Sequence, residues 1–526
     1  MTSTLMRAAF RRTTAAAAAA AAGLAAGFVS YEAAPTSCEA ASNTLESVSI
    51  IDRPRSKWIE VEQRDLADSF VDWNDPDLAY VEALRTLRSA YDMPVEAMRG
   101  LSALFLSEAK AGLAGEASSL RMLPTFVDQR VTGQEKGDFY ALDLGGTNFR
   151  VLRLTLLGDG KVGPVTQGKY KVPTAIKQSN AETLFGFLAD SVATFLATEC
   201  GGNPTGNLGF TFSFPVEQDA LDSGRLVVWN KEFSASGCVG ENVVALLQEQ
   251  LESRGIQLKV KALANDTVGT MEAAAYASPT TAMGVILGTG TNAAYLEKTA
   301  NVGKWRGAPS EEMVINTEWG NLDMSGAMTV FDAAIDAASP NPTQQRYEKM
   351  ISGMYLGELC RVSVLSPEVL PAFSEAFAKG LRATYAERMS LPTNLMAQIE
   401  SDATPSLSAT AKALSAAGLP EGTLRDRVLL REACVCISTR AARLSAMGVV
   451  SLLEQIKGGA PSAVSEGGKA TIAVDGTVFE CYPYFKERME LGMALMLGEE
   501  ASSNIELILA KDGSGVGAAI IAAIAK

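Results

Sequence analysis

The chain contains 526 residues, with 46 basic side chains, 60 acidic side chains and no histidine. The absence of histidine excludes Ser-His-Asp and Cys-His hydrolases, histidine-ligated zinc and haem held by a proximal histidine. Acid–base chemistry near neutral pH must then use carboxylates, lysine, cysteine or tyrosine. The net charge of −14 argues against a general nucleic-acid binder, because neutralising phosphate requires a basic surface. The length predicts roughly two to four domains.

Residues 1–40 differ in composition from the rest of the chain. Arginines precede an uncharged run at residues 13–31, and the first acidic residue is Glu32. This pattern is typical of an organelle transit peptide, but the run is also about as long as a minimal membrane span, so both interpretations stay open. The odd number of cysteines, 7, without a C-x-x-C pair favours a reducing compartment. We therefore expect a protein of the plastid, the mitochondrion or a cytosol-facing membrane, and not a secreted one.

After a polar connector at residues 41–76, the apolar residues alternate between helical and strand periodicity. The helical pattern covers residues 77–114, 184–197, 243–253 and 429–455. The strand pattern covers residues 139–144, 150–156, 208–214, 258–263 and 285–287. Strands interleaved with helices predict an α/β fold with mixed sheets. Because segment 285–292 is similar to segment 141–148, we expect two related halves around a central cleft.

Two glycine turns that follow predicted strands are candidate phosphate sites. Gly145 and Gly146 let the backbone approach a ligand closely, and their amides can hold phosphate oxygens. Asp143, just before them, is a candidate Mg²⁺ ligand through water. The alternative is a plain β-turn. The donors after this turn are Thr147, Asn148 and Arg150. The second turn is Gly288-Thr289-Gly290, and a weaker glycine motif at a predicted helix start is Gly513-Ser514-Gly515.

A separate group of polar residues suits a ligand with many hydroxyl groups, because each buried hydroxyl needs a hydrogen-bond partner. Ser213 ends an aromatic strand, and Asn230 and Lys231 follow in the next loop. Asp266, beside Asn265 at another strand end, is the candidate base that accepts a proton from a substrate hydroxyl. The alternatives are an aromatic core strand, a solvated lysine and a helix N-cap.

Three further polar residues lie in segments of mixed character. Glu318 is an acid in an otherwise apolar stretch. Gln345 and Glu348 are three residues apart and so share one face of a helix, where solvated charges are the alternative.

Together these segments resemble the eukaryotic hexokinase family, from about residue 77 to residue 526. The motifs that carry the resemblance are DLGGTNFR at 143–150, LGFTFSFP with WNKEF at 208–233, NDTVGT at 265–270 and YEKMISGMYLGE at 347–358. The phrases at 284–295, 304–307 and 315–321 are most similar to the plant and algal branch. A single copy of the module is present.

The resemblance implies a two-lobed actin-like ATPase fold of the hexokinase and Hsp70 type, with a small and a large domain flanking a cleft. It implies a small lobe at residues 77–262, a large lobe at residues 263–526 and a C-terminal helix that packs back on the small lobe. It also implies ATP-dependent phosphorylation of D-hexoses (glucose, and also fructose and mannose) at the 6-hydroxyl, with Mg²⁺. The partners are then hexose and ATP, with a monomer expected and no nucleic acid.

The motif match implies roles for individual residues. Asp266 matches the general base, and Lys231 the cation that stabilises charge beside it. The sugar contacts are Ser213, Asn230, Lys231, Asn265, Asp266, Asn292, Glu318, Gln345 and Glu348. The nucleotide contacts are Asp143, which also serves Mg²⁺, Gly145, Gly146, Thr147, Asn148, Arg150, Gly288, Thr289, Gly290, Thr393, Gly513, Ser514 and Gly515.

The sequence departs from the family at Asn230, where the family usually has threonine, and this puts sugar affinity and selectivity in doubt. Two other classes of protein compete with the enzyme. One is a catalytically weak, hexokinase-like sugar sensor that acts through protein partners, with which Asn230 and an N-terminal anchor are compatible. The other is an actin-like filament protein, in which the sugar-contact residues would have no purpose.

Overall fold

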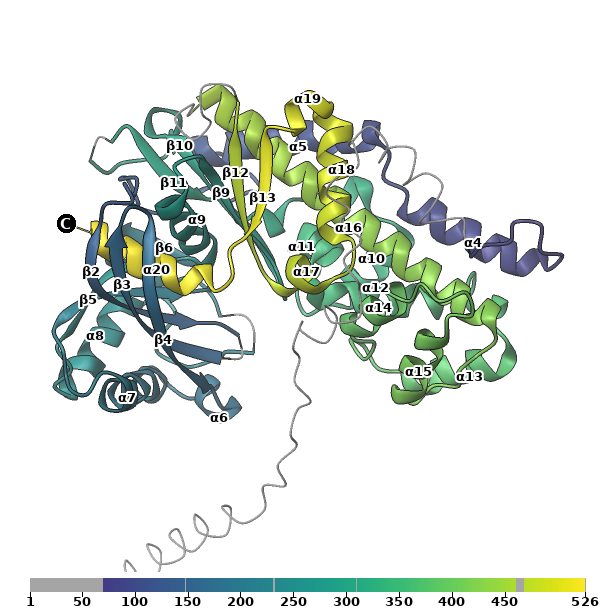
Figure 1. Cartoon of the computed structure of the whole chain (residues 1–526), viewed down its shortest axis with the longest axis horizontal. Helices are drawn as coiled ribbons and strands as arrows, with labels where there is room; N and C mark the ends of the chain where they lie inside the picture. The colour runs from purple at the N-terminus through teal and green to yellow at the C-terminus, as the bar shows by residue number, and fades with distance from the viewer. Residues whose placement is uncertain (1–69, 147, 230–231, 309, 460–467, 526) are drawn as a thin grey trace, which may run out of the picture. The chain divides into compact units, whose positions relative to one another are not determined.

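The computed structural model describes residues 70–146, 148–229, 232–308, 310–459 and 468–525. Within these residues two mixed sheets form, as the alternating pattern predicts (Figure 1). The five-stranded sheet has the order β4-β3-β2-β5-β8, and the six-stranded sheet has the order β1-β11-β10-β9-β12-β13. A separate pair, β6 with β7, lies outside both sheets. The segments 1–40 and 13–31 fall outside the described residues, as does most of the connector at 41–76.

The strands have the following bounds: β1 Leu123–Pro124, β2 Lys136–Leu144, β3 Asn148–Gly158, β4 Lys161–Lys171, β5 Gly206–Phe212, β6 Val216–Ala220, β7 Ser223–Leu226, β8 Leu258–Ala264, β9 Thr281–Leu287, β10 Thr291–Lys298, β11 Glu312–Asn316, β12 Ala470–Asp475 and β13 Ile505–Leu509. The α-helices are α4 Leu78–Tyr91, α5 Val95–Ala114, α6 Thr174–Lys177, α7 Ala181–Glu199, α8 Val243–Ser253, α9 Asp266–Ala277, α10 Val330–Ala338, α11 Arg346–Ile351, α12 Gly353–Val364, α13 Glu375–Thr384, α14 Thr393–Glu400, α15 Ser408–Ala416, α16 Leu424–Gly459, α17 Thr477–Cys481, α18 Phe485–Leu497, α19 Glu499–Ser502 and α20 Gly513–Ile524.

Both faces of the five-stranded sheet carry buried cores over β2, β3 and β5, whereas the edge strand β4 is largely exposed. Successive side chains of a strand point to opposite faces of the sheet. On β2, Leu142 and Leu144 join a core formed with α7 and α8. Ala141, which precedes Leu142 and points to the opposite face of the strand, joins a second core formed with α20. Figure 1 shows α20, the last helix of the chain, lying against this sheet. Parallel pairing of β2 with β5 and of β5 with β8 brings three strand ends to one edge.

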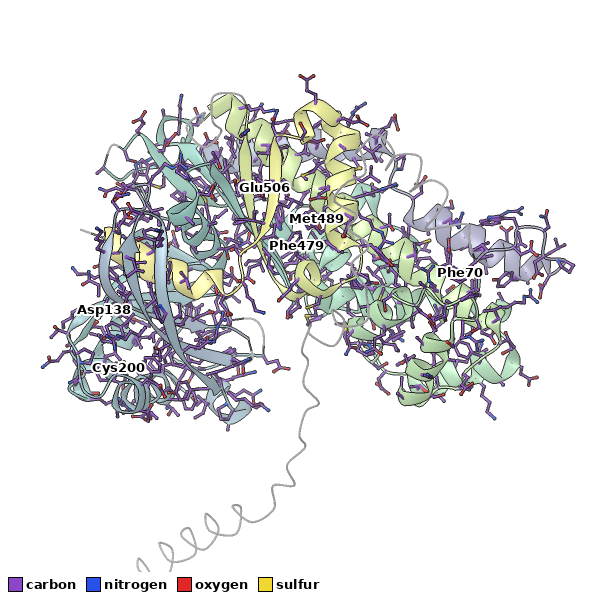
Figure 2. The ribbon with its side chains drawn as sticks, in the orientation of Figure 1. Phe70, Asp138, Cys200, Phe479, Met489 and Glu506 are labelled. Atoms are coloured by element: carbon purple, nitrogen blue, oxygen red, sulfur yellow. The ribbon has the colours of Figure 1, made fainter. Side chains whose placement is uncertain are left out.

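The six-stranded sheet packs on the long helix α16. This helix is the one stretch of the described chain that is long and apolar enough to span a membrane, but 83% of its apolar window is buried inside the protein. Its buried side chains join a core that includes Phe479 and Met489, which Figure 2 labels. The burial identifies α16 as the core helix of a globular fold.

The packing of α4 and α5 differs from the lobe division that we predicted at residues 262 and 263. The two helices, separated at Pro94, pack on α16 and share its core with the six-stranded sheet. Their apolar faces contact residues that are far away in the sequence, and the order of the chain does not reveal such contacts. The division into a small lobe at 77–262 and a large lobe at 263–526 therefore stays a prediction. Within it, α4 and α5 belong to the first range by sequence but pack with elements of the second.

Three segments connect the two sheets. Residues 125–135 run from β1 to β2. From here on, the connector means this segment and not the polar stretch at residues 41–76. Helix α9 runs from β8 to β9, and residues 510–512 run from β13 into α20. Helices α9 and α20 cross at such close range that a Cβ atom at Gly517 would overlap the backbone of Gly269. The elements that carry the candidate site therefore share a rigid crossing point.

Candidate active site

The first glycine turn closes the antiparallel hairpin of β2 and β3, as predicted. The register places Asp143 opposite Arg150, and the Gly145 amide donates to the Asn148 carbonyl over 3.1 Å. Asp143 is 6% exposed and accepts hydrogen bonds from the Arg150 Nε (3.0 Å) and the Ser514 Oγ (3.0 Å). Arg150 also pairs with Asp512. One arginine thus joins the hairpin to the start of α20, while Thr147 lies outside the described residues.

The glycines at the start of α20 have a packing role that needs no nucleotide. A Cβ at Gly513 would lie 3.3 Å from the Thr270 Cα, and one at Gly515 would lie 3.0 Å from the Leu152 side chain. Both glycines are buried, and the Ser514 carbonyl accepts from the Thr211 hydroxyl over 3.0 Å. These three residues therefore fix α20 against α9 and the five-stranded sheet. Of them, only the Ser514 hydroxyl reaches the hairpin turn.

The second glycine turn joins β9 to β10 and is braced from two sides. The Gly288 amide donates to the Gly290 carbonyl over 3.0 Å, and the amides of Gly353 and Met354 donate to the carbonyls of Gly288 (2.8 Å) and Thr289 (3.1 Å). Thr393 is a weaker candidate for contacting the nucleotide, and its hydroxyl already makes two hydrogen bonds within the protein. It donates to the Gly353 carbonyl over 2.6 Å and accepts from the Gly357 amide over 3.0 Å.

Sequence reasoning missed the Asp475-Gly476 pair at the end of β12. A Cβ at Gly476 would overlap the Leu287 carbonyl, so only glycine allows β12 to approach the second turn this closely. Burial raises the pKa of Asp475 to about 6, against the lowering effects of the Gly476 amide and Arg150. Asp266 and Asp512 add like charge in the same direction. The Asp-Gly dipeptide after an apolar strand was the available signal, because it repeats the pattern of the first motif.

A network of three asparagines and one glutamate connects the two sheets. The Asn292 amide donates to Asn316 Oδ1 (2.8 Å), to Glu318 Oε1 (3.3 Å) and to Asn265 Oδ1 (3.4 Å). The Asn316 amide donates to the same Glu318 oxygen over 2.9 Å. Asn316 is 6% exposed, and its central position was not predicted. A small hollow borders Asn265 and Asn316.

Asp266 occupies the first turn of α9 and is not its N-cap. Asn265 is the N-cap and accepts from the Thr267 amide over 3.0 Å, and Asp266 Oδ1 accepts from the same amide over 2.9 Å. Ser213, 7% exposed, follows β5, and its amide donates to the Leu144 carbonyl of β2 over 3.4 Å. The parallel strands β2, β5 and β8 thus bring Asp143, Ser213 and Asp266 to one edge of the sheet.

Glu348 contacts the end of the second glycine turn. Its Oε2 accepts from the Thr291 amide over 3.0 Å, and a Cβ at Gly290 would lie 2.7 Å from that oxygen. Gln345 has a left-handed backbone, with φ at 51°, and its Oε1 accepts from the Asn341 amide over 2.7 Å. Glu318 has the same unusual φ of 51°. Non-glycine residues held in this region are common at functional sites.

The aromatic residues around Ser213 form a core, which was the alternative for this strand. Phe212 and Phe214 lie 4.8 Å apart between ring centroids, and Phe214 meets Trp229 at 4.9 Å. The loop beyond Trp229 contains Asn230 and Lys231, and both lie outside the described residues.

Comparisons with known proteins identify the family of this chain. Two family profiles, both described as hexokinase, match residues 83–276 and 282–524. The chain belongs to the hexokinase family. It is 42% identical to Hexokinase-7 of Oryza sativa subsp. japonica over 453 residues, which cover 84% of this chain and 96% of that protein. It is also 42% identical to Hexokinase-1 of Arabidopsis thaliana over 444 residues, which cover 82% of this chain and 88% of that protein.

Solved hexokinase structures share the fold of this chain. The hexokinase of Schistosoma mansoni, complexed with glucose, is 35% identical and superposes with a TM-score of 0.76, covering 85% of this chain and 98% of that one. A second hexokinase crystal structure is 32% identical, with a TM-score of 0.73, and covers 85% of this chain and 99% of that one. The two-lobed sugar-kinase fold of the actin-like type is therefore established for this chain.

Proposed function

We propose that this protein is a hexokinase that transfers the γ-phosphoryl group of ATP to the 6-hydroxyl of D-glucose and related hexoses. The observation that carries the proposal is the position of Asp266 beside Asn265. The Asn265 Oδ1 accepts from the side-chain amide of Asn292, which also donates to Glu318. This network combines donors and acceptors, and a polyhydroxylated ligand needs both. It lies in a chain of the hexokinase family.

The sugar would bind in this polar network. Glu318 Oε1 accepts from the side-chain amides of Asn292 and Asn316, which orient this carboxylate, and the carboxylate would accept from a sugar hydroxyl. Glu348 and Ser213 supply further acceptors, and Gln345 completes the set from the start of α11. Asn230 and Lys231 would contribute from the loop after Trp229, and Lys231 would also stabilise developing charge.

The nucleotide phosphates would lie at the two glycine turns, where backbone amides and Arg150 offer donors. The buried carboxylates on both sides of the turns fit Mg²⁺, which prefers oxygen ligands and retains several waters. Asp143 is already bound to Arg150 and Ser514, so it would hold Mg²⁺ through water. Bound Mg²⁺ would neutralise phosphate charge and orient the transferred group.

Asp266 would accept the proton of the 6-hydroxyl as that oxygen attacks the γ-phosphorus in line. Asn265 holds the start of α9, so the carboxylate is fixed at the strand edge. Closure of the two lobes over the sugar would exclude water and limit wasteful ATP hydrolysis. Because the base is a carboxylate, the reaction needs no histidine.

A coupled assay for ADP release, with glucose, fructose or mannose as acceptor, tests the function directly. We expect Mg²⁺-dependent turnover with glucose, and sugar-dependent ADP release that vanishes without sugar. Glucose should also raise the melting temperature of the protein in a thermal shift. Binding of glucose without turnover would instead support the sugar sensor. The absence of both turnover and stabilisation would revive the filament protein.

We further infer a monomer, and a targeting role for residues 1–40 as a transit peptide or a membrane anchor. Light scattering of the purified protein tests the first inference. Imaging of residues 1–40 fused to a fluorescent protein, with and without the uncharged run at 13–31, tests the second. Diffuse fluorescence throughout the cytosol would contradict targeting.

A further inference from the structure

Glu272 is a buried carboxyl group at the contact between two of the three segments that join the sheets. It lies on α9, six residues after Asp266, and only 2% of its surface is exposed. The Val131 amide of the connector donates to it. In the part of the chain that the structure describes, its Oε2 has no hydrogen-bond partner. An unpartnered buried carboxylate oxygen is costly, so this group calls for an explanation.

The connector and α9 are held together on both sides of Glu272. The Arg130 guanidinium donates to the carbonyls of Pro279 (3.0 Å) and Thr281 (3.2 Å), just after α9. The Tyr276 hydroxyl donates to the Glu135 carbonyl over 2.8 Å and accepts from the Gly158 amide over 3.0 Å. Because both segments join the two sheets, this carboxyl lies where a movement of one sheet relative to the other would act.

Few charges are available to compensate an ionised Glu272. Arg130 and Glu135 are the charged groups that act on it from the connector. Helix α20 and strands β5 and β9, which pack on α9, contain no charged residue within their bounds. Strands β10, β11 and β12 carry Glu297, Lys298, Glu312 and Asp475. Of these, Asp475 lies at the other end of α9, where it interacts with Asp266.

We propose that Glu272 is a positioning residue that couples glucose binding to the uptake of a proton. The inference rests on the function proposed above: a sugar held by Asn265 and Asp266 fixes the start of α9, and lobe closure presses α9 on the connector. An ionised Glu272 needs water or a donor at Oε2, which only a looser contact can supply. The sugar-bound arrangement therefore favours the neutral carboxyl group.

The proton affinity of the group fits this role in a chain without histidine. Burial raises the pKa of Glu272 to about 7, with Glu135 acting in the same direction and with Arg130 and the Val131 amide opposing. Its charge state therefore changes in the range where histidine would ordinarily act as the pH-sensitive group.

Isothermal titration of glucose into the full chain, without nucleotide, tests the proposal between about pH 6 and pH 8. Repeating each titration in buffers of different ionisation enthalpy measures the protons taken up. We expect uptake of a fraction of a proton near pH 7. Glucose affinity should fall by about tenfold as the pH rises across this range, if the pKa of the carboxyl differs by about one unit between the free and bound states.

The variant Glu272→Gln keeps the shape of the side chain but cannot ionise. It should bind glucose without proton uptake and with a pH-independent affinity near that of the wild type at low pH. Glu135→Gln is the matched control from the same junction, because the pKa of Glu135 itself is lowered. It should still take up a proton, with the pH dependence moved to a slightly lower pH because one neighbouring negative charge is removed. Asp475→Asn should retain the uptake as well.

The outcomes separate this inference from the proposed function. A wild type that binds glucose without proton uptake overturns the role of Glu272, whatever the variants do. Uptake that persists in Glu272→Gln, or that disappears in Asp475→Asn alone, overturns it too. A wild type that binds no glucose at any pH instead overturns the proposed function, on which the inference depends.

Discussion

At the scale of single residues, the proposed reaction depends on one proton acceptor, Asp266. Asp266 lies in the first turn of α9, where its Oδ1 accepts from the Thr267 amide. We expect Asp266→Ala to lose nearly all turnover and to keep glucose binding within about tenfold of the wild type, because the remaining sugar contacts survive. Single-turnover assays and glucose titration measure the two quantities separately. Substantial remaining phosphorylation by the Asp266→Ala variant would contradict the assignment of this residue as the base.

Asn316 gives a second prediction at this scale, because it orients two sugar-contact candidates and is not itself one. Its amide donates to Glu318 and its oxygen accepts from Asn292. We expect Asn316→Asp to raise the KM for glucose by about tenfold or more, because it removes a donor and places like charge beside Glu318, a change of roughly 1.5–3 kcal/mol. The control is Asn207→Ala. In the wild type the side-chain amide of Asn207 donates to the carbonyl of Ala522, a residue distant in the sequence. Equal effects of both variants would show that Asn316 has no special role.

At the scale of elements, the crossing of α9 and α20 joins the helix that carries the proposed base to the helix that contacts the hairpin of β2 and β3. A Cβ at Gly517 would overlap the Gly269 carbonyl, so Gly517→Ala must push the helices apart. We expect a loss of stability of at least about 1–3 kcal/mol, with a parallel loss of activity. Denaturant unfolding followed by circular dichroism measures the change.

Gly100→Ala is the control for this prediction. Gly100 lies inside α5, and nothing within 4 Å would meet its added Cβ. Because alanine is the better helix former, this variant should gain about 0.5–1 kcal/mol. A Gly517 variant as stable as the wild type would show that the two helices can separate without cost.

At the scale of the whole molecule, the buried carboxyl of Glu272 makes stability depend on pH. Its pKa is about 7 in the folded chain and close to 4.5 in the unfolded chain, so the folded state holds an extra proton between these values. The free energy of unfolding should therefore fall as the pH rises from about 4.5 to about 7, and it should not fall further above that range. The size of this contribution is roughly 1–3 kcal/mol.

Comparison with Glu272→Gln isolates this contribution from those of other groups. The carboxyl groups with lowered pKa, such as Asp332 and Asp402, contribute the opposite slope, but below the pH window of Glu272. The wild type should lose stability relative to the variant as the pH rises through this window, in unfolding curves at matched ionic strength. A constant difference between the two proteins would contradict the buried titration.

Much of the site could be predicted from the sequence, because its parts are local. A strand, two glycines and another strand form a hairpin whatever surrounds them, and the register of Asp143 with Arg150 follows. Asn316 was missed because no local pattern distinguishes it, whereas Asp475 was missed although the Asp-Gly dipeptide after an apolar strand was a signal for it. Gly513 and Gly515 have the glycine pattern of a nucleotide site, yet in the fold they pack against Thr270 and Leu152.

The sequence by itself determined the alternation of strands and helices, the two glycine turns, the family motifs and the exclusion of histidine chemistry. Each of these depends on residues adjacent in the chain. Only the tertiary structure decided that α4 and α5 pack with α16, that Asn316 joins Asn292 to Glu318, and that Glu272 is buried. The physical reason is that burial, desolvation and hydrogen bonding depend on neighbours in space, which chain folding brings together from distant positions.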